Sequence, residues 1–316
     1  HIVPVIALLD RCRAGGAGRD GTVDGLVIAI VDLRAVAGDH HPVAFLQIGD
    51  ALRQRRQRER VGAEVGLAIA ITDHDTANGV PEAKTAGEKL GIEVVGGLEL
   101  GCGWYGKEVH MLAYDIDPHD EKLNGTLEWI VTDRDERNKK MVDLMAKDGI
   151  MIDIDQLKAE HPGSIIGRPH FALCLIRAGL ADSVQDAFVR YLDPGRKYYI
   201  RRHFLSVEEA AELIRGAGGV SSIAHPMQYK LDDEGMTELM ERARDAGVSG
   251  LECYYSGYSP EVCARLKALA DAYGFCATAG SDWHGSHKPH IEMGSGMHGE
   301  LCAPYELLRA LREREK

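Results

Sequence analysis

The sequence lacks several features that mark whole classes of protein. Its seven cysteines are scattered and form no Cys-x-x-Cys pair, which argues against a disulfide framework or structural zinc site and favours reduced thiols in a cytoplasmic protein. It contains no apolar run of the roughly 18 residues that a membrane-spanning helix needs. Positive charge is also in deficit, with a formal net charge of −12, whereas proteins that coat duplex nucleic acid carry basic surfaces. We therefore expect neither a membrane nor duplex DNA as a partner.

Lysine is missing from residues 1–62, which contain nine arginines, whereas the rest of the chain uses both residues. Leu26–Val31 could form a strand, but no alternation of strands and helices organises this region. We interpret residues 53–60 as a solvated basic run rather than a phosphate-binding arm, because no aromatic residue lies within it. Residues 1–62 are therefore treated as an atypical segment that either lacks the first strand of the fold or comes from a different reading frame.

Beyond residue 62 short apolar segments alternate with amphipathic ones. The apolar segments are rich in small or β-branched residues, and they predict strands at 67–72, 92–100, 109–114, 219–225, 248–255 and 275–282. The amphipathic segments predict helices at 81–90, 206–215, 233–246 and 260–273. This alternation indicates an α/β protein with a parallel sheet or barrel.

One stretch interrupts the alternation. Residues 118–202 contain a long polar helical pattern at 121–147, followed by shorter helical patterns around Asp155, Pro169 and Asp182. We interpret this stretch as a small helical insertion that caps the substrate site, between barrel segments at 63–117 and 203–316.

Ligand-type side chains follow or flank most of the predicted strands. They are Asp73, His74 and Asp75, then Glu99, His110 and His225, and finally Asp282 and His284. A single histidine at a strand end is more often structural than a ligand. Several such positions together are difficult to explain that way, because buried charges are costly unless they are paired or bound to metal. Since the functional face of an α/β barrel lies at the C-terminal ends of its strands, the pattern predicts one metal site.

The ligand types narrow the choice of ion. Imidazole and carboxylate groups without thiolate suit Mn²⁺, Fe²⁺ or Zn²⁺ better than Ca²⁺. The number of candidate ligands exceeds what one tetrahedral ion needs, so we expect two to three ions, with Glu99 as the bridging carboxylate. Asp73, His74, Asp282 and His284 are the candidate catalytic residues.

These motifs resemble those of the PHP (polymerase and histidinol phosphatase) family. The matching segments are Thr72-Asp73-His74-Asp75-Thr76, Gly97-Leu98-Glu99, Glu108-Val109-His110, Ala224-His225-Pro226 and Gly280-Ser281-Asp282-Trp283-His284-Gly285. Their order and spacing agree with the family, and the resemblance covers about residues 63–300. Gly167-Arg168-Pro169-His170 and Tyr198-Tyr199-Ile200 are similar to the branch that contains nucleoside 3′,5′-bisphosphate phosphatases and 5′→3′ exoribonucleases acting on short RNA.

The resemblance implies a distorted (β/α)₇ barrel that binds up to three metal ions, often Mn²⁺, with a helical insertion over its mouth. The implied metal ligands are His74, Glu99, His110, His225, Asp282 and His284. Arg168 and His170 would hold the substrate phosphate, although Arg168 also fits a surface arginine before a helix-starting proline. A nearby basic cluster fits a solvated edge better than substrate contacts; it comprises Lys197, Arg201, Arg202 and His203.

The first motif of the family is not found. The family begins with a strand carrying Asp-Leu-His-x-His, followed by Ser-Asp-Gly, and these supply two histidines and an aspartate to the metals. Asp20-Gly21-Thr22 matches part of the second motif, but Arg11 and Arg13 stand where histidines are expected. His40 and His41 are adjacent, so their side chains diverge. We therefore expect no ligand from residues 1–62.

The favoured function is hydrolysis of a phosphate monoester or short nucleotide by a metal-bound hydroxide, with the metals neutralising the phosphoryl oxygens. Two alternatives stay open. A metal-dependent amidohydrolase shares the barrel and the ligand types, but would usually carry a carbamylated lysine at a strand end. A catalytically impaired relic that binds nucleotide or metal would account for the missing first motif.

Overall fold

The computed structural model describes residues 26–31, 67–161, 166–284, 288, 290–301 and 303–314, with the backbone alone for 26–31 and for Leu67. The basic run at 53–60, the Asp20 segment and the His40-His41 pair lie outside the described residues. Leu26–Val31 forms a strand, as the sequence suggested. The chain divides into two compact units, His1–Asn124 with Leu205–Lys316, called here the barrel unit, and Gly125–Phe204, called the helical unit.

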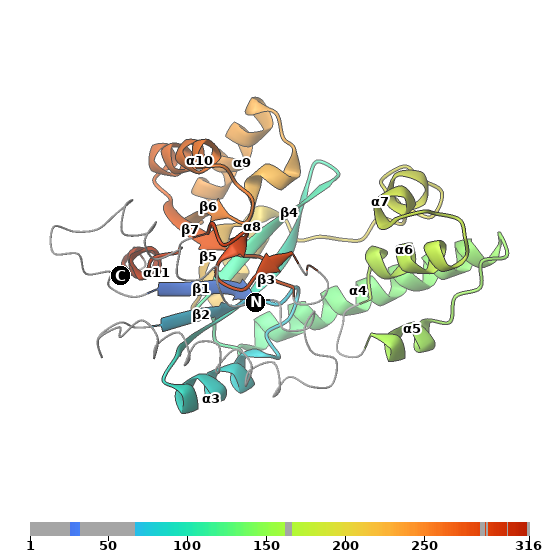
Figure 1. Cartoon of the computed structure of the whole chain (residues 1–316), viewed down its shortest axis with the longest axis horizontal. Coiled ribbons are helices and arrows are strands. Elements are labelled where there is room, and N and C mark those ends of the chain that lie inside the picture. The colour runs from blue at the N-terminus through green and yellow to red at the C-terminus, as the bar shows by residue number, and fades with distance from the viewer. Residues whose placement is uncertain are drawn as a thin grey trace. The chain divides into compact units, whose positions relative to one another are not determined.

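The barrel unit is built on a seven-stranded sheet in which the strands follow one another in chain order (Figure 1). The strands are β1 Leu26–Val31, β2 Leu67–Ile71, β3 Glu93–Trp104, β4 Lys107–Tyr114, β5 Val220–Ile223, β6 Gly250–Tyr255 and β7 Cys276–Gly280. The sheet curls until its two end strands, β1 and β7, approach each other. The expected distorted (β/α)₇ barrel is therefore confirmed.

One strand departs from the parallel arrangement: β4 runs antiparallel to both β3 and β5. A tight turn at Tyr105 and Gly106, both with positive φ, joins β3 to β4 without a helix. The hairpin extends β3 beyond its predicted end. Glu99 consequently lies in the middle of β3, and His110 lies inside β4 rather than at its start. Because β4 is reversed, its first half lies at the same end of the barrel as the C-terminal ends of the parallel strands.

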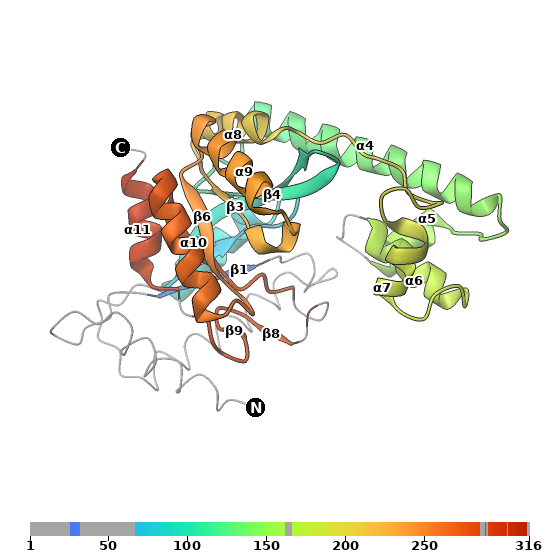
Figure 2. The same ribbon diagram turned by 90° about the horizontal axis from the view of Figure 1, so that it is seen from above.

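Helices cover the outer face of the sheet (Figure 2). They are α3 Val80–Leu90, α8 Val207–Gly216, α9 Asp233–Asp245 and α10 Pro260–Tyr273. Their ends follow from local chemistry. Ser206 and Glu209 form a capping box at the start of α8, and α10 begins after the N-cap Ser259 and ends at Gly274 in the left-handed conformation.

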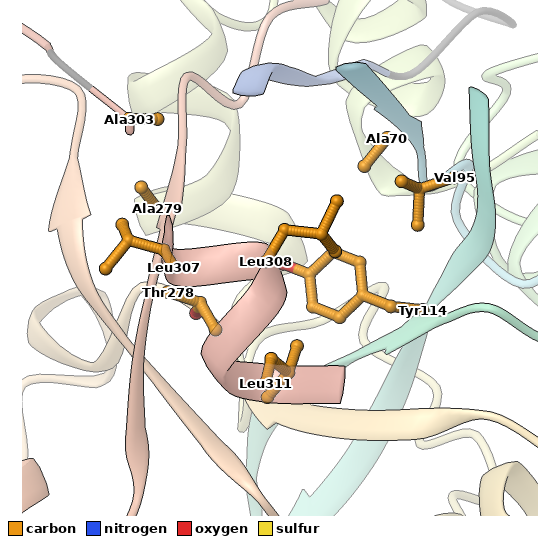
Figure 3. Close-up of a pocket in the computed structure, with 9 residues that line it drawn as sticks. All are labelled: Ala70, Val95, Tyr114, Thr278, Ala279, Ala303, Leu307, Leu308 and Leu311. Atoms are coloured by element: carbon orange, nitrogen blue, oxygen red, sulfur yellow. The ribbon is translucent and has the colours of Figure 1, made fainter. Parts of the chain in front are cut away.

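The inner face of the sheet is apolar at the end opposite the strand-end histidines. There α11, Tyr305–Glu313, packs Leu308 and Leu311 against Val95 and Tyr114. Figure 3 shows these side chains around a cavity of about 30 Å³. The small volume and apolar lining suit core packing rather than a substrate site. The polar end of the same inner face is therefore the part of the barrel available for chemistry.

A glycine allows β3 and β4 to approach closely beside this polar end. A Cβ atom on Gly97 would lie 2.1 Å from the carbonyl oxygen of Ala113, so no other residue fits there. Side chains alternate between the two faces of a strand. Val95, Gly97 and Glu99 thus share the inner face, with the apolar residue at one end and the carboxylate at the other.

The helical unit has its own core. It contains most of α4 Glu121–Ala146, then α5 Ile154–Glu160, α6 Arg168–Arg177, α7 Val184–Ala187 and the π-helical turn η2 Phe188–Leu192. Met141, Met145, Phe171 and Leu175 form the centre of the core. The sequence predicts this insertion at 118–202, whereas the compact unit spans Gly125–Phe204. None of the helices in the described part of the chain is both long and apolar enough to cross a membrane.

Candidate metal centre

The loop after β2 is fixed alongside the middle of β3. The backbone N–H of Glu99 donates to the carbonyl of Asp73 at 3.0 Å, and the N–H of Asp75 donates to the carbonyl of Glu99 at 2.9 Å. Asp75 has a positive φ of 54°, and its carboxylate accepts a hydrogen bond from the N–H of Gly101. These contacts place His74, between the two aspartates, beside the carboxylate of Glu99.

Glu99 is the centre of the site. The residue is 3% exposed, and its carboxylate is surrounded by imidazoles from three different elements. His74 Nε2 lies 3.3 Å from Oε2, while His110 Nδ1 and His225 Nε2 lie 2.8 and 2.9 Å from Oε1. The ligand atoms of His74, Glu99 and His110 all lie within 4.8 Å of one another. One buried carboxylate surrounded by imidazole nitrogens is a suitable ligand set for Mn²⁺, Fe²⁺ or Zn²⁺.

The charges in this cluster are strongly coupled. Burial alone would raise the pKa of Glu99, but the positive charges of His74 and His110 and the hydrogen bonds from the imidazoles hold it well below its usual value. Burial likewise lowers the pKa of His110, but the negative charge of Glu99 and contacts with Glu108 outweigh it and raise that pKa to about 10. The Glu99 carboxylate is therefore charged, and protons on the surrounding histidines balance its negative charge. A bound metal cation would replace those protons.

A second group of side chains follows β7. Asp282 has a positive φ of 52°, and its Oδ2 accepts hydrogen bonds from Tyr255 and Lys288, each at 2.5 Å. His284 Nδ1 lies 3.3 Å from Oδ1 of Asp282. Burial opposes ionisation of Asp282, but the charges of His284 and Lys288 lower its pKa. The His284 ring lies 6.1 Å from that of His74, centroid to centroid, which links this group to the Glu99 cluster.

The sequence did not predict Glu252, Tyr255 or Lys288 as part of the site. Glu252 lies on the inner face of β6, is 1% exposed, and its Oε2 accepts the backbone N–H of His225 at 2.6 Å. Burial raises its pKa well above the usual value, with the negative charges of Asp282 and Glu99 adding to the effect. A single acidic residue inside the apolar strand Leu-Glu-Cys-Tyr-Tyr was the available signal. Lys288 follows its strand by eight residues, so no periodicity marks it.

The predicted residues thus fall into two sets. The structure brings the six expected metal ligands to one end of the barrel unit: His74, Glu99, His110, His225, Asp282 and His284. Asp73 is buried beside them. Arg168 and His170 belong to the helical unit, at the start of α6. There the Arg168 guanidinium lies 5.6 and 5.7 Å from the ring centroids of Phe188 and Tyr199.

The contacts of His170 and of the basic cluster are now defined. His170 Nδ1 accepts the N–H of Gly167 at 3.1 Å and so caps α6. Lys197 is exposed and pairs with Asp148, and His203 is exposed and pairs with Asp133. Arg202 is buried against Phe204, 4.2 Å from its ring centroid, so it does not belong to the solvated edge expected for this cluster.

Comparison with known proteins defines the family. No family model matches the chain. The chain is 32% identical over 228 residues to a 3′,5′-nucleoside bisphosphate phosphatase of Chromobacterium violaceum, covering 72% of this chain and 80% of that protein. This chain belongs to the PHP family of metal-dependent phosphoesterases. The 5′-3′ exoribonuclease Rnm of Escherichia coli is 28% identical over 247 residues, covering 78% of this chain and 82% of that protein.

Solved structures agree with the PHP assignment. A protein of Bifidobacterium adolescentis classed as a metal-dependent phosphoesterase superposes with a TM-score of 0.68 at 29% identity, covering 93% of this chain and 96% of that one. A protein of Chromobacterium violaceum described as an amidohydrolase, crystallised with sulfate and without metal, gives a TM-score of 0.66 at 30% identity, covering 81% and 89%. This chain therefore shares its fold with one solved structure described as a phosphoesterase and with another described as an amidohydrolase.

Proposed function

We propose that this chain hydrolyses a phosphate monoester or short nucleotide, such as a nucleoside bisphosphate or a short RNA, using two to three Mn²⁺ ions held by six ligands that include Glu99. Fe²⁺ and Zn²⁺ are the alternative ions. The observation that carries the proposal is the buried Glu99 carboxylate with three imidazole nitrogens within 3.3 Å, in a chain of the PHP family. A cytoplasmic location belongs to the same proposal and is supported by the free cysteines of the described residues.

Divalent ions at this site would polarise phosphoryl oxygens and lower the pKa of water. The contribution of the chain is to hold the ligands in place. Glu99 is kept charged although it is buried, and His74, His110 and His225 reach it from three separate elements. Lys288 adds a positive charge beside Asp282, at a position one-third exposed, where it could contact an anionic substrate.

The substrate phosphate is assigned to Arg168 and His170 within the helical unit. Arg168 is the first residue of α6, where a helix N-terminus favours anions. A guanidinium group also presents a planar pair of donors that matches phosphate oxygens. The bisphosphate phosphatase and the exoribonuclease among the relatives both act on phosphate esters of nucleotides, which supports a nucleotide as the substrate.

A catalytically impaired metal-binding relic is the second candidate, and one observation favours it. Strand β1, which pairs with β2 next to His74, reads Leu-Val-Ile-Ala-Ile-Val and offers no ligand. An amidohydrolase is less well supported, because Lys288, the lysine at the site, is paired with Asp282. Metal content separates the first two candidates, since fewer than two ions per chain would favour the relic.

The test is phosphate release from a nucleoside 3′,5′-bisphosphate by metal-stripped protein reloaded with Mn²⁺. We expect His225→Ala and Asp282→Ala to abolish release, while His119→Ala, at an exposed position of the barrel unit, retains it. Undiminished release from both site variants would refute the assignment. Turnover of a chromogenic amide without phosphate release would favour the amidohydrolase.

A further inference from the structure

Glu252 is a buried carboxylate that the proposed ligand set does not use. It lies on the inner face of β6, between the strands that lead to His225 and Asp282. Burying a carboxylate is costly unless its oxygens have partners. Its Oε2 has one, the backbone N–H of His225, whereas its Oε1 is fully buried and has no hydrogen-bond partner within the described part of the chain.

The residue that Glu252 contacts is held in an unfavourable conformation. His225 has φ 24° and ψ 58°, a region that residues with a Cβ atom rarely adopt. The short hydrogen bond from its N–H to Glu252 supports this turn. The turn directs the ring inward, so that Nε2 reaches Glu99 at 2.9 Å. Glu252 therefore stabilises the backbone that presents one of the candidate ligands.

The second nitrogen of the same imidazole also needs a partner. With Nε2 facing Glu99, Nδ1 is buried and has no hydrogen-bond partner among the described residues. The rings of Tyr229 and Tyr255 both lie 5.6 Å from the His225 ring. Their hydroxyl groups are already engaged, that of Tyr229 with the carbonyl of Ala224 and that of Tyr255 with Asp282. Oε1 of Glu252, likewise without a partner among the described residues, belongs to the same carboxylate whose Oε2 accepts the backbone N–H of His225.

Metal-binding histidines usually donate their second ring N–H to a carboxylate or carbonyl, which fixes the tautomer and the ring orientation. We propose that Glu252 is the positioning residue for His225: its Oε2 holds the backbone N–H, and its Oε1, unpartnered in the described part of the chain, is the acceptor available to Nδ1–H when Nε2 is presented to the metal. The inference rests on the metal centre of the proposed function. It concerns metal binding rather than the identity of the substrate.

The experiment is a calorimetric titration of the metal-stripped 316-residue chain with Mn²⁺. Glu252→Gln keeps the shape of the side chain and one acceptor oxygen, while Glu252→Leu removes both acceptors. We expect Glu252→Gln to weaken Mn²⁺ binding by about 10- to 100-fold, the usual effect of losing such a partner, and Glu252→Leu to weaken it further.

Thr278→Val is the matched control. Thr278 lies on the inner face of β7, is 4% exposed, and hydrogen-bonds to the hydroxyl of Ser222 at 2.8 Å. The Thr278→Val substitution thus removes a buried polar contact from the same barrel and leaves His225 and its partners unchanged. We expect it to bind Mn²⁺ as the wild-type chain does, even if melting in EDTA shows a comparable loss of stability.

Three results would overturn the proposal. They are unchanged Mn²⁺ affinity in Glu252→Gln, an equal loss of affinity in Thr278→Val, and a wild-type chain that binds no Mn²⁺. Should Glu252→Leu fail to fold, the isosteric glutamine variant still decides the matter. Phosphate release plays no part in these readouts, so a chain that binds Mn²⁺ but releases no phosphate would refute only the proposed function.

Discussion

Glu99 supplies the only negative charge in the cluster that it forms with three histidines: His74, His110 and His225. Removing this charge should therefore abolish the stabilisation of the fold by a bound metal ion. Glu99→Gln preserves the volume of the side chain and removes its charge. The three imidazoles at 2.8 to 3.3 Å from the carboxylate would remain. The measurement is the change in melting temperature that Mn²⁺ produces in each protein relative to its own metal-free state. Any effect of the substitution on the metal-free fold therefore cancels.

The expected change in melting temperature on Mn²⁺ binding follows from simple estimates. A ligand that binds only the folded state adds about 2.7 kcal/mol when its concentration is 100 times the dissociation constant. For a chain of this size, 1 kcal/mol corresponds to roughly 2–4 °C, so the wild-type melting temperature should rise by about 5–11 °C. One unit charge at about 4 Å contributes roughly 4 kcal/mol at an effective dielectric constant of 20, more than the ~2.7 kcal/mol that a 100-fold change in affinity requires. At the same Mn²⁺ concentration Glu99→Gln would gain about 0.4 kcal/mol, a shift below about 2 °C.

The assay is differential scanning calorimetry at pH 8 after treatment with EDTA, with and without Mn²⁺. Glu93→Gln is the control, because Glu93 is a partly buried carboxylate at the start of the same strand, β3, where it pairs with Arg312 at 2.6 Å and accepts a hydrogen bond from Tyr305, away from the three imidazoles. The control should keep most of the wild-type shift. A full Mn²⁺ shift in Glu99→Gln would show that the ion binds elsewhere.

Three further predictions concern parts of the chain outside this cluster. Leu308→Ala, at the apolar end of the barrel, should lower the free energy of unfolding by about 2–4 kcal/mol in urea melts and leave the Mn²⁺ shift unchanged. Burial raises the pKa of Asp133, but hydrogen bonds from His203 lower it overall. That pair should therefore stabilise the chain above about pH 4 and cease to do so as the pH falls through the lowered pKa, so the difference between wild-type and His203→Ala in urea melts should vanish in acid. Arg168→Met should raise KM for a nucleoside bisphosphate at unchanged Mn²⁺ affinity, and an unchanged KM would exclude Arg168 from the substrate site.

The sequence predicted the strand-end residues well because each lies directly after an apolar run. His74, His225 and Asp282 come within a few residues of β2, β5 and β7, and periodicity alone identifies such boundaries. The same holds for α10, whose Ser259 and Gly274 caps match the ends predicted from the sequence. The ends of these strands and of α10 could therefore be predicted from local sequence patterns alone.

The direction of β4 could not be read from periodicity, because an apolar strand looks the same in either direction. The turn at Tyr105 and Gly106 carried the relevant signal: a two-residue connection can only join antiparallel strands. Reversal of β4 brings His110 to the functional end from the first half of its strand, whereas the sequence suggested a strand that begins there. The role of Glu252 could not be predicted for a different reason. A single acidic residue in an apolar strand can be interpreted only when its partner is known, and that partner is His225 on the neighbouring segment.

Backbone conformation explains why the strand-end pattern works. Asp75, His225 and Asp282 all have positive φ, between 24° and 54°, although each carries a Cβ atom, and such conformations cost about 1–3 kcal/mol each. They follow three different parallel strands, at the positions where the chain must turn sharply to direct a neighbouring or attached side chain inward. The surroundings offset the cost: the N–H of Asp75 donates to the backbone carbonyl of Glu99, and the N–H of His225 donates to the carboxylate of Glu252. The Glu252 carboxylate thus holds the backbone of His225 beside the proposed metal site, and a substitution of Glu252 should disturb ligand direction before it disturbs the fold.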